Sequence, residues 1–586
     1  MPTEKTSRHG GDRVAEALQA HGVRAIFTLC GGHISPILSA SKARGIRIVD
    51  VRDEATAVFA ADASARLLGL PGVAAVTAGP GISNTITALK NAQLAQSPVI
   101  LIGGAAPTAL QGRGALQDID QRPLVAPHVK LFKKITRVCD LGPAVDEAFA
   151  VAQAGVPGPV FIECPVDLLY DEVSIRQWYA DAAGKGRSLP DRLLRFYLNR
   201  HVKKMFHGSH EHAAPQVRAV AAPRASDASL QAALAALAKA QRPLLVIGSQ
   251  ALVLSAEAQH LAQAVAKLGV PVYLSGMARG LLGRQHPLQM RHQRRQALRE
   301  ADCVLLAGVP CDFRLDYGKH VRRNATLIAA NRSVKDARLN RKPDIAAIGD
   351  AGLFLQALAQ AQPAGGSANS RLAPWVAQLR GRDAQRELEI DQQARATGEF
   401  VNPIALFRAL EQEAGENAVL VADGGDFVAT ASYVLHPRAP LSWLDPGAFG
   451  TLGVGAGFAL GAALACPASE VWIIFGDGAC GYGLVEFDTF VRHGIPVIAL
   501  VGNDAGWTQI AREQVKMLHD DVATVLARTN YHEVAAGFGA EGILVRHMDQ
   551  VPAALARARA LAHSGKPVLV NVWLDKTEFR EGSLSM

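Results

Sequence analysis

A short group of residues in the last third of the chain has the side chains and spacing of a metal–diphosphate site. Asp477 stands between Gly476 and Gly478, and Asn503 follows farther along. A carboxylate and an amide oxygen are hard ligands that suit Mg²⁺, an ion that keeps several waters and borrows phosphate oxygens. The two glycines let the backbone approach a diphosphate closely. Gly-Asp-Gly alone is common in turns, so the prediction depends on the elements around it.

Two strands must place these residues at one edge of a sheet. Residues 471–475 and 496–501 are predicted strands, and residues 484–493 between them have the length and polarity of a helix. A strand–helix–strand unit makes the two strands parallel, with a right-handed crossover. Asp477 and Asn503 then lie side by side at the carboxyl edge, where open α/β sheets bind ligands. The joint pattern favours the metal–diphosphate site over a plain turn.

This segment resembles the thiamine diphosphate signature of the acetohydroxyacid synthase, oxalyl-CoA decarboxylase and 2-hydroxyacyl-CoA lyase superfamily. The resemblance covers nearly the whole chain, and residues 444–461 and 499–509 are especially similar. It implies an α/β fold of three doubly wound domains with mainly parallel sheets. It also implies that Mg²⁺ is bound by Asp477, Asn503 and the carbonyl of Ala505, although the family usually has Asn where this chain has Asp504. The other residues that match the cofactor site are Gly424, Leu452 (which wedges the cofactor into a V shape), Gly476, Gly478 and Ala479.

Glu54 is the predicted catalytic residue. It follows a predicted strand and opens a helix, where the helix dipole alone would favour an acidic residue. Residues 50–62 resemble the family's glutamate motif, which implies that Glu54 hydrogen-bonds N1′ of the aminopyrimidine ring and shares a proton with it. In the family this glutamate comes from the opposite subunit. The resemblance therefore implies a homodimer as the smallest active unit, and we expect a homotetramer.

Further residues of the N-terminal region are expected to complete the site. His33 follows Gly31 and Gly32 in a loop that matches the one reaching the thiazolium end of the cofactor. An acid/base or oxyanion-binding role for His33 is one interpretation, and a structural role is the alternative. The remaining matches are the active-site glutamine Gln117 and the cofactor contacts Pro80 and Asn84.

The central region is expected to bind a nucleotide. In the family, the acetohydroxyacid synthases place FAD here and the CoA enzymes place an ADP moiety. After the predicted strand at residues 326–330 this chain has Asn331 and Arg332 instead of an acidic residue. An acid suits ribose hydroxyls, whereas arginine suits an added phosphate such as the 3′-phosphate of CoA. We therefore expect CoA or ADP rather than FAD, with an ordinary surface arginine as the alternative. Other residues in nucleotide-contact-like loops are Arg279, Arg284 and Arg314.

Alternating apolar runs and polar stretches divide the chain into segments. We predict a pyrimidine-binding domain at 1–170, a basic helical linker at 171–225, a central domain at 226–362, a linker at 363–400 that begins flexibly, a diphosphate-binding domain at 401–575 and a mobile tail at 576–586. In the basic linker, Leu194, Leu198 and Val202 recur at helical spacing, which predicts a helix packed on a neighbouring domain or subunit, with a membrane surface as the alternative. The predicted strands are 25–28, 46–51, 73–77, 99–102, 159–162, 244–247, 272–274, 303–307, 326–330, 471–475, 496–501 and 567–574.

Composition and charge narrow the class of protein. The 586 residues are 49% hydrophobic and 19% charged, which fits two to four globular domains. The net charge is +8, but aromatic residues make up only 6% and no basic stripe is interleaved with them, so we expect no nucleic-acid partner. The seven cysteines form no CxxC pair, which argues against a zinc ribbon or a disulfide framework. Residues 446–469 are uncharged but rich in glycine, so we expect a packed helix and no membrane span. The polar first ten residues lead us to expect a cytoplasmic protein.

The resemblance implies a thiamine diphosphate- and Mg²⁺-dependent 2-hydroxyacyl-CoA lyase. Such an enzyme cleaves the C1–C2 bond of its substrate to an aldehyde and formyl-CoA, and the reverse reaction is an acyloin-type condensation. The first alternative is an acetolactate synthase-like carboligase acting on pyruvate or other 2-keto acids. Gly103-Gly104 argues against it, because acetohydroxyacid synthases typically have Gly-Gln there. The second alternative is a non-catalytic thiamine diphosphate-binding subunit, which would be expected to lose one of Glu54, Asp477 or Asn503.

Overall fold

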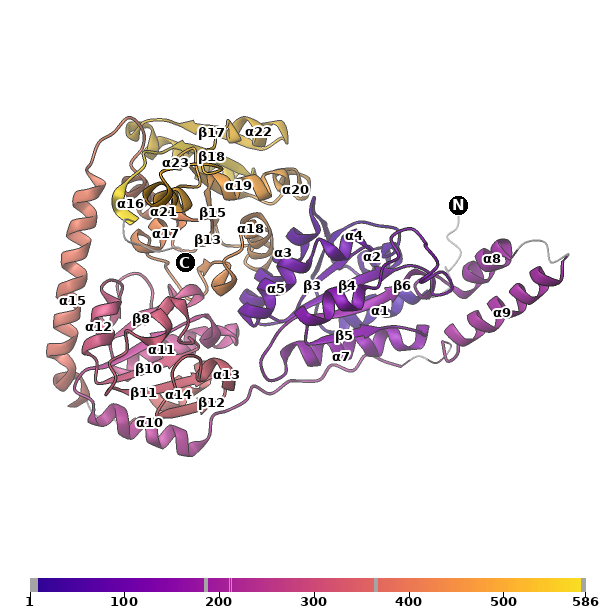
Figure 1. Cartoon of the computed structure of the whole chain (residues 1–586), viewed down its shortest axis with the longest axis horizontal. Coiled ribbons are helices and arrows are strands. Elements are labelled where there is room, and N and C mark those ends of the chain that lie inside the picture. The colour runs from indigo at the N-terminus through magenta and orange to yellow at the C-terminus, as the bar shows by residue number, and fades with distance from the viewer. Residues whose placement is uncertain (1–8, 184–187, 210, 212, 363–366, 581–586) are drawn as a thin grey trace. The chain divides into compact units, whose positions relative to one another are not determined.

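The computed structural model describes residues 9–183, 188–209, 211, 213–362 and 367–580. They form two compact units (Figure 1). The N-terminal unit comprises Met1–Ala65 and Leu70–Ala221, and the second unit comprises Arg66–Gly69 and Ala222–Met586. The terminal residues 581–586, which include most of the predicted tail, lie outside the described residues, as do residues 363–366 of the predicted flexible linker.

The N-terminal unit is built around one parallel sheet with the strand order β2-β1-β3-β4-β6-β5. Its inner strands are short runs of apolar residues that are buried along their length, as expected when helices cover both faces of a parallel sheet. The strands are β1 Ala25–Leu29, β2 Arg47–Asp50, β3 Gly72–Val76, β4 Val99–Ala105, β5 Leu131–Lys134 and β6 Val160–Pro165. The helices are α1 Gly10–Ala20, α2 Ser35–Ala43, α3 Glu54–Leu68, α4 Pro80–Ser83, α5 Ile86–Ala95, α6 Gln121–Val125, α7 Leu141–Gln153, α8 Glu172–Ala182 and α9 Leu189–Met205.

The second unit begins with a central sheet whose strand order is β12-β11-β10-β7-β8-β9. All of its strand pairs are parallel. The strands are β7 Pro243–Ile247, β8 Val272–Leu274, β9 Gln289–Met290, β10 Cys303–Ala307, β11 Thr326–Asn331 and β12 Ile345–Ile348. The helices of this part are α10 Asp227–Lys239, α11 Ala258–Leu268, α12 Arg294–Glu300, α13 Val334–Ala337 and α14 Ala351–Ala361, followed by the long connecting helix α15 Ser367–Ala394.

A second parallel sheet of this unit, the C-terminal sheet, has the order β14-β13-β15-β16-β18-β17. Its core is a continuous cluster of buried side chains that includes Phe407, Trp443 and Trp472. The strands are β13 Val419–Asp423, β14 Trp443–Leu444, β15 Val471–Gly476, β16 Val497–Asn503, β17 Glu541–Val545 and β18 Val568–Trp573. The helices are α16 Pro403–Glu413, α17 Asp426–Val434, α18 Val454–Ala465, α19 Asp477–Gly483, α20 Phe487–His493, α21 Thr508–Leu518, α22 Tyr531–Gly537 and α23 Val551–His563.

The three parallel sheets with their helices confirm the predicted α/β fold class. Three local expectations change. The stretch predicted as one helix at 484–493 is a 3-10 turn at Leu484–Glu486 followed by α20. The flexible stretch predicted at the start of the linker has already become helical at Ser367. Residues of the predicted tail contact the C-terminal domain, because Phe579 packs edge-on against Tyr433 and the Arg580 guanidinium lies 4.8 Å above the same ring.

The uncharged stretch at 446–469 contains α18, which is buried along most of its length and packs against β13 and β15. Within the described residues, no helix combines the length and the apolar character needed to cross a membrane. The close packing of α18 explains its glycines, since a Cβ on Gly455 would lie 2.4 Å from the Phe475 ring.

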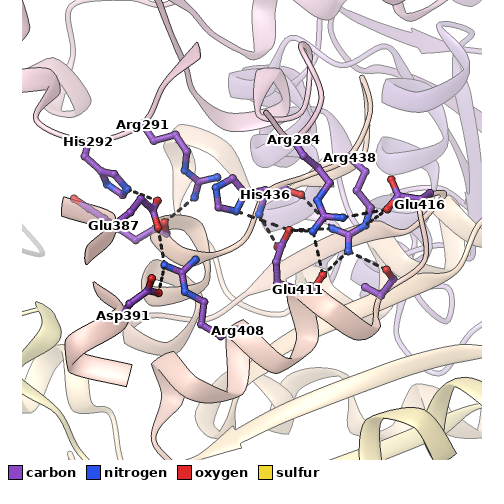
Figure 2. A network of polar contacts seen from close by, with 12 residues as sticks. Arg284, Arg291, His292, Glu387, Asp391, Arg408, Glu411, Glu416, His436 and Arg438 are labelled. Carbon is purple, nitrogen blue, oxygen red and sulfur yellow. Dashed lines mark hydrogen bonds and ion pairs between the residues drawn. The ribbon is translucent and has the colours of Figure 1, made fainter. Parts of the chain in front are cut away.

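Two glutamates, the buried Glu411 and the partly buried Glu387, join the central part of the second unit to its C-terminal part (Figure 2). Glu411 of α16 accepts hydrogen bonds from Arg284 at 2.8 Å and, through its backbone carbonyl, from Arg438 at 2.7 Å. Glu387 of α15 accepts from His292 at 2.8 Å and from Arg408 at 2.6 Å. Because each charged group is paired, the network fixes the two parts of the unit relative to each other at a tolerable desolvation cost.

Candidate active site

Asp477 and Asn503 lie at the carboxyl edge of two neighbouring strands of the C-terminal sheet, as predicted. Asp477 is the first residue of α19, directly after β15, and Asn503 is the last residue of β16. The parallel register pairs Gly476 with Gly502, so the two side chains start from adjacent positions. The Asp477 carboxylate accepts from the backbone N–H of Gly478 at 2.8 Å and of Gly506 at 3.1 Å. These bonds hold the carboxylate against the loop that follows Asn503.

The Asn503 side chain is oriented to present an oxygen. Its Nδ2 donates to the Thr529 carbonyl at 3.2 Å and to Asn571 Oδ1 at 3.3 Å. Its Oδ1 is buried and has no hydrogen-bond donor among the described residues. A buried acceptor left without a donor costs free energy, and a cation would satisfy it. The amide therefore fits the role of a Mg²⁺ ligand.

The predicted backbone ligand lies in a turn. Ala505 adopts a left-handed conformation with φ of 56°. Its carbonyl accepts from Leu526 N at 3.0 Å, which uses one of the two oxygen lone pairs. In the described part of the chain no three His, Cys, Asp or Glu side chains converge to hold a metal ion. A cation here would therefore depend on the Asn503 amide and on backbone or phosphate oxygens in addition to Asp477.

Electrostatics at this edge favour a cation. Burial and, to a lesser extent, the neighbouring Asp504 together raise the pKa of Asp477 to about 7. Burial also raises the pKa of Asp504. Two carboxyl groups in a desolvated position stabilise a bound divalent ion, because its positive charge favours their ionised forms. Asp504 thus adds negative charge where the family usually has a neutral amide.

Two glycines make room for a group larger than a metal ion. Gly424 has φ of 146°, and a Cβ there would lie 2.9 Å from the backbone nitrogen of Gly476. A Cβ on Gly478 would lie 2.4 Å from the ring of Trp507. A side chain at either position would push against Gly476 or Trp507 beside α19, whose first turn offers backbone N–H groups to an anion. The glycine pattern fits a diphosphate.

Asp423 and Trp507 are functional candidates that sequence reasoning missed. The Asp423 carboxylate accepts from Gly455 N at 2.7 Å and from Gly453 N at 3.1 Å, so it fixes the start of α18 and the adjacent Leu452. Complete burial raises the pKa of Asp423 to about 7. The signal was present, since Asp423-Gly424 ends a strand much as Gly476-Asp477 does, but β13 was not among the predicted strands.

A cavity of about 880 Å³ opens at this edge of the second unit. Its walls include Trp507, Asp504 and the exposed start of α21, and central-domain side chains close another side. Of the predicted cofactor and metal residues, those lining it are Gly424, Leu452, Gly476, Asp477, Gly478 and Ala479. The size suits a cofactor or drug-sized ligand.

The five residues predicted to contact a nucleotide lie in different surroundings. Arg279 and Arg314 line the cavity, where Arg279 donates to the Ser432 carbonyl at 2.8 Å and Arg314 pairs with Asp312 at 2.6 Å. Arg284 is held by Glu411 and Glu416 in the network of Figure 2. The placement of these arginines leaves only the first two near a ligand-sized space.

The pair at the end of β11 departs from expectation. The Arg332 side chain is 4% exposed and forms an ion pair with Asp350 at 2.8 Å. Asn331 is buried and donates to Gln250 Oε1 at 2.5 Å. The argument that Arg332 meets a 3′-phosphate is therefore not supported by this structure, because the guanidinium has an internal carboxylate partner that the sequence pattern did not reveal.

In the N-terminal unit, Glu54 and Asn84 come together at the carboxyl edge of the sheet. Glu54 is the first residue of α3 and is 7% exposed. Asn84 Nδ2 donates to Glu54 Oε2 at 3.0 Å. A Cβ on Gly81 would lie 3.6 Å from Glu54 Oε1, so the glycine after Pro80 keeps that side of the carboxyl group uncrowded. The arrangement fixes one oxygen and presents the other.

His33 and Gln117 lie in loops at the same edge of the N-terminal sheet. His33 Nδ1 is 3.0 Å from Thr77 Oγ1, and partial burial lowers the pKa of the imidazole. A Cβ on Gly104 would lie 2.5 Å from the His33 Cβ, and one on Gly31 would lie 2.4 Å from the Thr77 Cβ. Gly104 thus makes space for His33, whereas Gly103 makes space for Phe161. Gln117 has φ of 62° and packs beside Gly79, whereas Gly32 is exposed.

The chain matches known protein families along most of its length. Residues 8–124 match the N-terminal TPP binding domain of thiamine pyrophosphate enzymes, residues 230–358 the central domain and residues 423–572 the C-terminal TPP binding domain. The chain is 50% identical to a 2-hydroxyacyl-CoA lyase 2 from Homo sapiens over 99% of its own length and 92% of that protein. It is 51% identical to one from Mus musculus, over 100% and 93%. A probable acetolactate synthase from Mycobacterium bovis is 34% identical, over 97% and 96%.

Proposed function

This chain belongs to the thiamine pyrophosphate enzyme family, and we propose on that basis that it is a thiamine diphosphate- and Mg²⁺-dependent 2-hydroxyacyl-CoA lyase. The reaction would break the C1–C2 bond of a 2-hydroxyacyl-CoA. Carbon 2 leaves as an aldehyde, and carbon 1 becomes formyl-CoA after gaining the proton that the hydroxyl group loses. The reverse reaction is an acyloin-type condensation. The proposal includes a homodimer as the smallest active unit and a homotetramer as the expected assembly.

One observation carries the choice of substrate class. Relatives named 2-hydroxyacyl-CoA lyase 2 are about half identical to this chain across nearly all of both sequences, whereas the acetolactate synthases are about one third identical. The Gly103-Gly104 doublet supports the same branch, since a side chain at Gly104 would collide with His33. CoA is therefore the proposed carrier of the substrate acyl group. Of the predicted nucleotide contacts, Arg279 and Arg314 line the cavity and are the ones proposed to bind its nucleotide part.

The C-terminal domain would hold the cofactor and metal. Asp477, the unpaired Oδ1 of Asn503 and the Ala505 carbonyl are the proposed Mg²⁺ ligands, and Gly424, Gly476 and Gly478 leave room for the diphosphate. Leu452, positioned through Asp423, would support the bent cofactor. When bound, thiamine diphosphate supplies a thiazolium ring that accepts the electron pair of the breaking bond.

Proton handling would fall to the N-terminal unit. Asn84 orients the Glu54 carboxyl group through Oε2, which leaves Oε1 to share a proton with the cofactor's aminopyrimidine. His33 is neutral near pH 7, because burial lowers its pKa, and its Nδ1 is engaged with Thr77. A neutral imidazole can exchange a proton with the substrate hydroxyl, so we propose His33 as the second proton-transfer group.

The test is a paired assay on purified protein with thiamine diphosphate and Mg²⁺. A 2-hydroxyacyl-CoA series of increasing chain length is offered in one arm and pyruvate in the other. Equimolar aldehyde and formyl-CoA in the first arm supports the lyase. Acetolactate from pyruvate without cleavage of any thioester would instead establish the carboligase that the 34%-identical relatives suggest. Tight cofactor binding with no turnover in either arm would indicate a non-catalytic subunit.

A further inference from the structure

Helices α8 and α9 of the N-terminal unit form a hairpin beside its sheet (Figure 1). One end of this hairpin is embedded in the core of the unit. Ile175, Val202, Met205 and Phe206 are buried there together with residues of α1 and α7. The C-terminal half of α9 is therefore a fixed part of the unit rather than a free linker.

Polar contacts reinforce the same end of the hairpin. Asp167, just before α8, accepts from the Tyr179 hydroxyl at 2.7 Å and from the backbone N–H of Thr108 at 2.9 Å. Thr108 Oγ1 also lies 2.6 Å from His201 Nε2 of α9. Both helices are thus tied to the loop that follows β4. The hairpin presents its other end on a rigid support.

The N-terminal half of α9 exposes large apolar side chains. The exposed fractions are 71% for Leu189, 62% for Leu193, 68% for Phe196 and 51% for Tyr197. Leu189, Leu193 and Phe196 follow helical spacing, so they share one face. Trp178 of α8 adds an exposed fraction of 49%. Solvent-exposed apolar side chains gathered in this way mark an interaction surface rather than an ordinary solvated one.

A basic group follows the apolar residues on the same helix. Arg200, Lys203 and Lys204 are exposed, and Arg200 and Lys204 continue the face of Leu193 and Phe196 at helical spacing. Phe196 and Lys204 are eight residues apart, which is about 12 Å along a helix. An interfacial helix buries apolar side chains to roughly 5–10 Å while Lys and Arg meet the phosphate groups. Arg192 and Arg195 lie among the apolar residues, and side chains of their length can reach from that depth to the phosphate level. With that, the order of apolar tip and basic collar matches the depth profile.

We propose that the α8–α9 hairpin docks on the surface of an anionic phospholipid bilayer. Leu189, Leu193, Phe196 and Tyr197 would enter the boundary between headgroups and acyl chains, and Arg200, Lys203 and Lys204 would contact lipid phosphates. Charge favours an anionic membrane over a second copy of the chain. Helix α9 carries five basic residues and one acidic residue, so two copies of it would repel each other. This inference does not depend on the proposed reaction.

The experiment uses the full chain with its cofactors and measures cosedimentation with vesicles. Vesicles of phosphatidylcholine alone are compared with vesicles containing phosphatidylglycerol, at low and at physiological salt. We expect binding to the anionic vesicles that weakens as salt rises. Replacing all three collar residues, Arg200→Gln, Lys203→Gln and Lys204→Gln, should lower partitioning about 100-fold, since each basic residue near such a surface contributes about five-fold. The tip variant Leu193→Gln with Phe196→Gln should lower it about 10-fold or more.

Matched controls come from exposed residues of the second unit. Leu388→Gln with Val334→Gln matches the tip variant, and Lys239→Gln with Lys267→Gln and Lys335→Gln matches the collar variant. Both controls should bind vesicles as the unsubstituted protein does. Absence of binding to anionic vesicles, or equal binding by all variants, would overturn the proposal. So would light scattering that shows the tip variant to have lost an oligomeric state, because the surface would then be an interface between copies.

Discussion

The sheet of the N-terminal unit and the C-terminal sheet of the second unit share one strand order. The order β2-β1-β3-β4-β6-β5 corresponds strand for strand to β14-β13-β15-β16-β18-β17, whereas the central sheet is ordered differently. Helices follow the corresponding strands, so loops at matching positions reach the carboxyl edge of each sheet. The two sheets therefore share their strand order and connections, and they differ in a few residues at the carboxyl edge.

Those residues divide the chemistry. Directly after β15 the chain places a carboxylate, Asp477, whereas directly after β3 it places the hydroxyl of Thr77. At the end of β16 stands Asn503, whereas β4 ends among small residues that leave room for His33. The C-terminal edge therefore presents fixed oxygens suited to a cation. The N-terminal edge presents Glu54 and His33, which are groups suited to moving protons.

Removing a proposed metal ligand should have the largest effect. In Asp477→Asn the side chain keeps its shape and loses its charge, so Mg²⁺ and diphosphate binding should weaken together. We expect about a 1,000-fold loss of kcat/KM at limiting cofactor, more than the 10–100-fold typical of groups behind the ligands. Titration with Mg²⁺ and thiamine diphosphate by calorimetry checks this. Unchanged cofactor affinity would show that the C-terminal edge is not the metal site.

Glu54→Gln should distinguish the role of the N-terminal edge in proton transfer from that of the C-terminal edge in cofactor binding. Asn84 can still hydrogen-bond the glutamine oxygen, so the fold and cofactor affinity should persist while proton transfer is lost. We expect kcat to fall about 100-fold or more, within the usual range for general acid–base groups. Single-turnover rates at saturating cofactor measure this directly. A loss of cofactor binding with little change in the saturated rate would reverse the roles assigned to the edges.

Sequence periodicity predicted the inner strands far better than the outer ones. The missed strands β5, β9, β12, β14 and β17 are all edge strands, and they are either very short or only partly buried, so no apolar run marks them. Buried β13 was missed as well, and with it the role of Asp423.

Residues whose positions depend on neighbouring segments of the chain could be placed from the sequence, whereas residues held by distant segments could not. Asp477 and Asn503 could be placed from one strand–helix–strand unit, because their proximity follows from local connectivity. Arg332 could not, since its partner Asp350 comes from a different loop, after β12. Arg284 likewise is held by Glu411 in another part of the fold. Pairing between distant segments is set by tertiary packing, which pattern analysis of one sequence does not resolve.

A smaller effect should come from the space beside α19. Gly478→Ala would push a methyl group against the Trp507 ring, which must then shift. Because this shift would displace the loop between β16 and α21, we expect thiamine diphosphate to bind about 10-fold more weakly. Gly481→Ala in the same helix is the matched control, because a Cβ there meets nothing within 4 Å. It should bind cofactor normally. Equal behaviour of the two variants would mean that the close approach at Gly478 has no functional consequence.

The smallest expected effect comes from a substitution in the network of Figure 2, which should change the stability of the protein at acid pH and not the two sheet edges. Burial and the nearby Arg291 lower the pKa of His436 to about 3 in the network of Figure 2, where Arg408 and Arg284 act in the same direction and Glu387 opposes them. The unfolded chain takes up a proton near pH 6.5, so His436 costs no stability above that pH. As the pH falls from 6.5 toward 3, the unfolded state is favoured by about 1.4 kcal/mol per pH unit. His436→Asn should remove about 2 kcal/mol of the stability lost between pH 7.5 and pH 5. Urea unfolding at the two pH values measures this, with kcat at pH 7.5 unchanged. An equal loss in both proteins would show that other groups set the acid sensitivity of this joint, and a lowered kcat would show that the network reaches the cofactor edge.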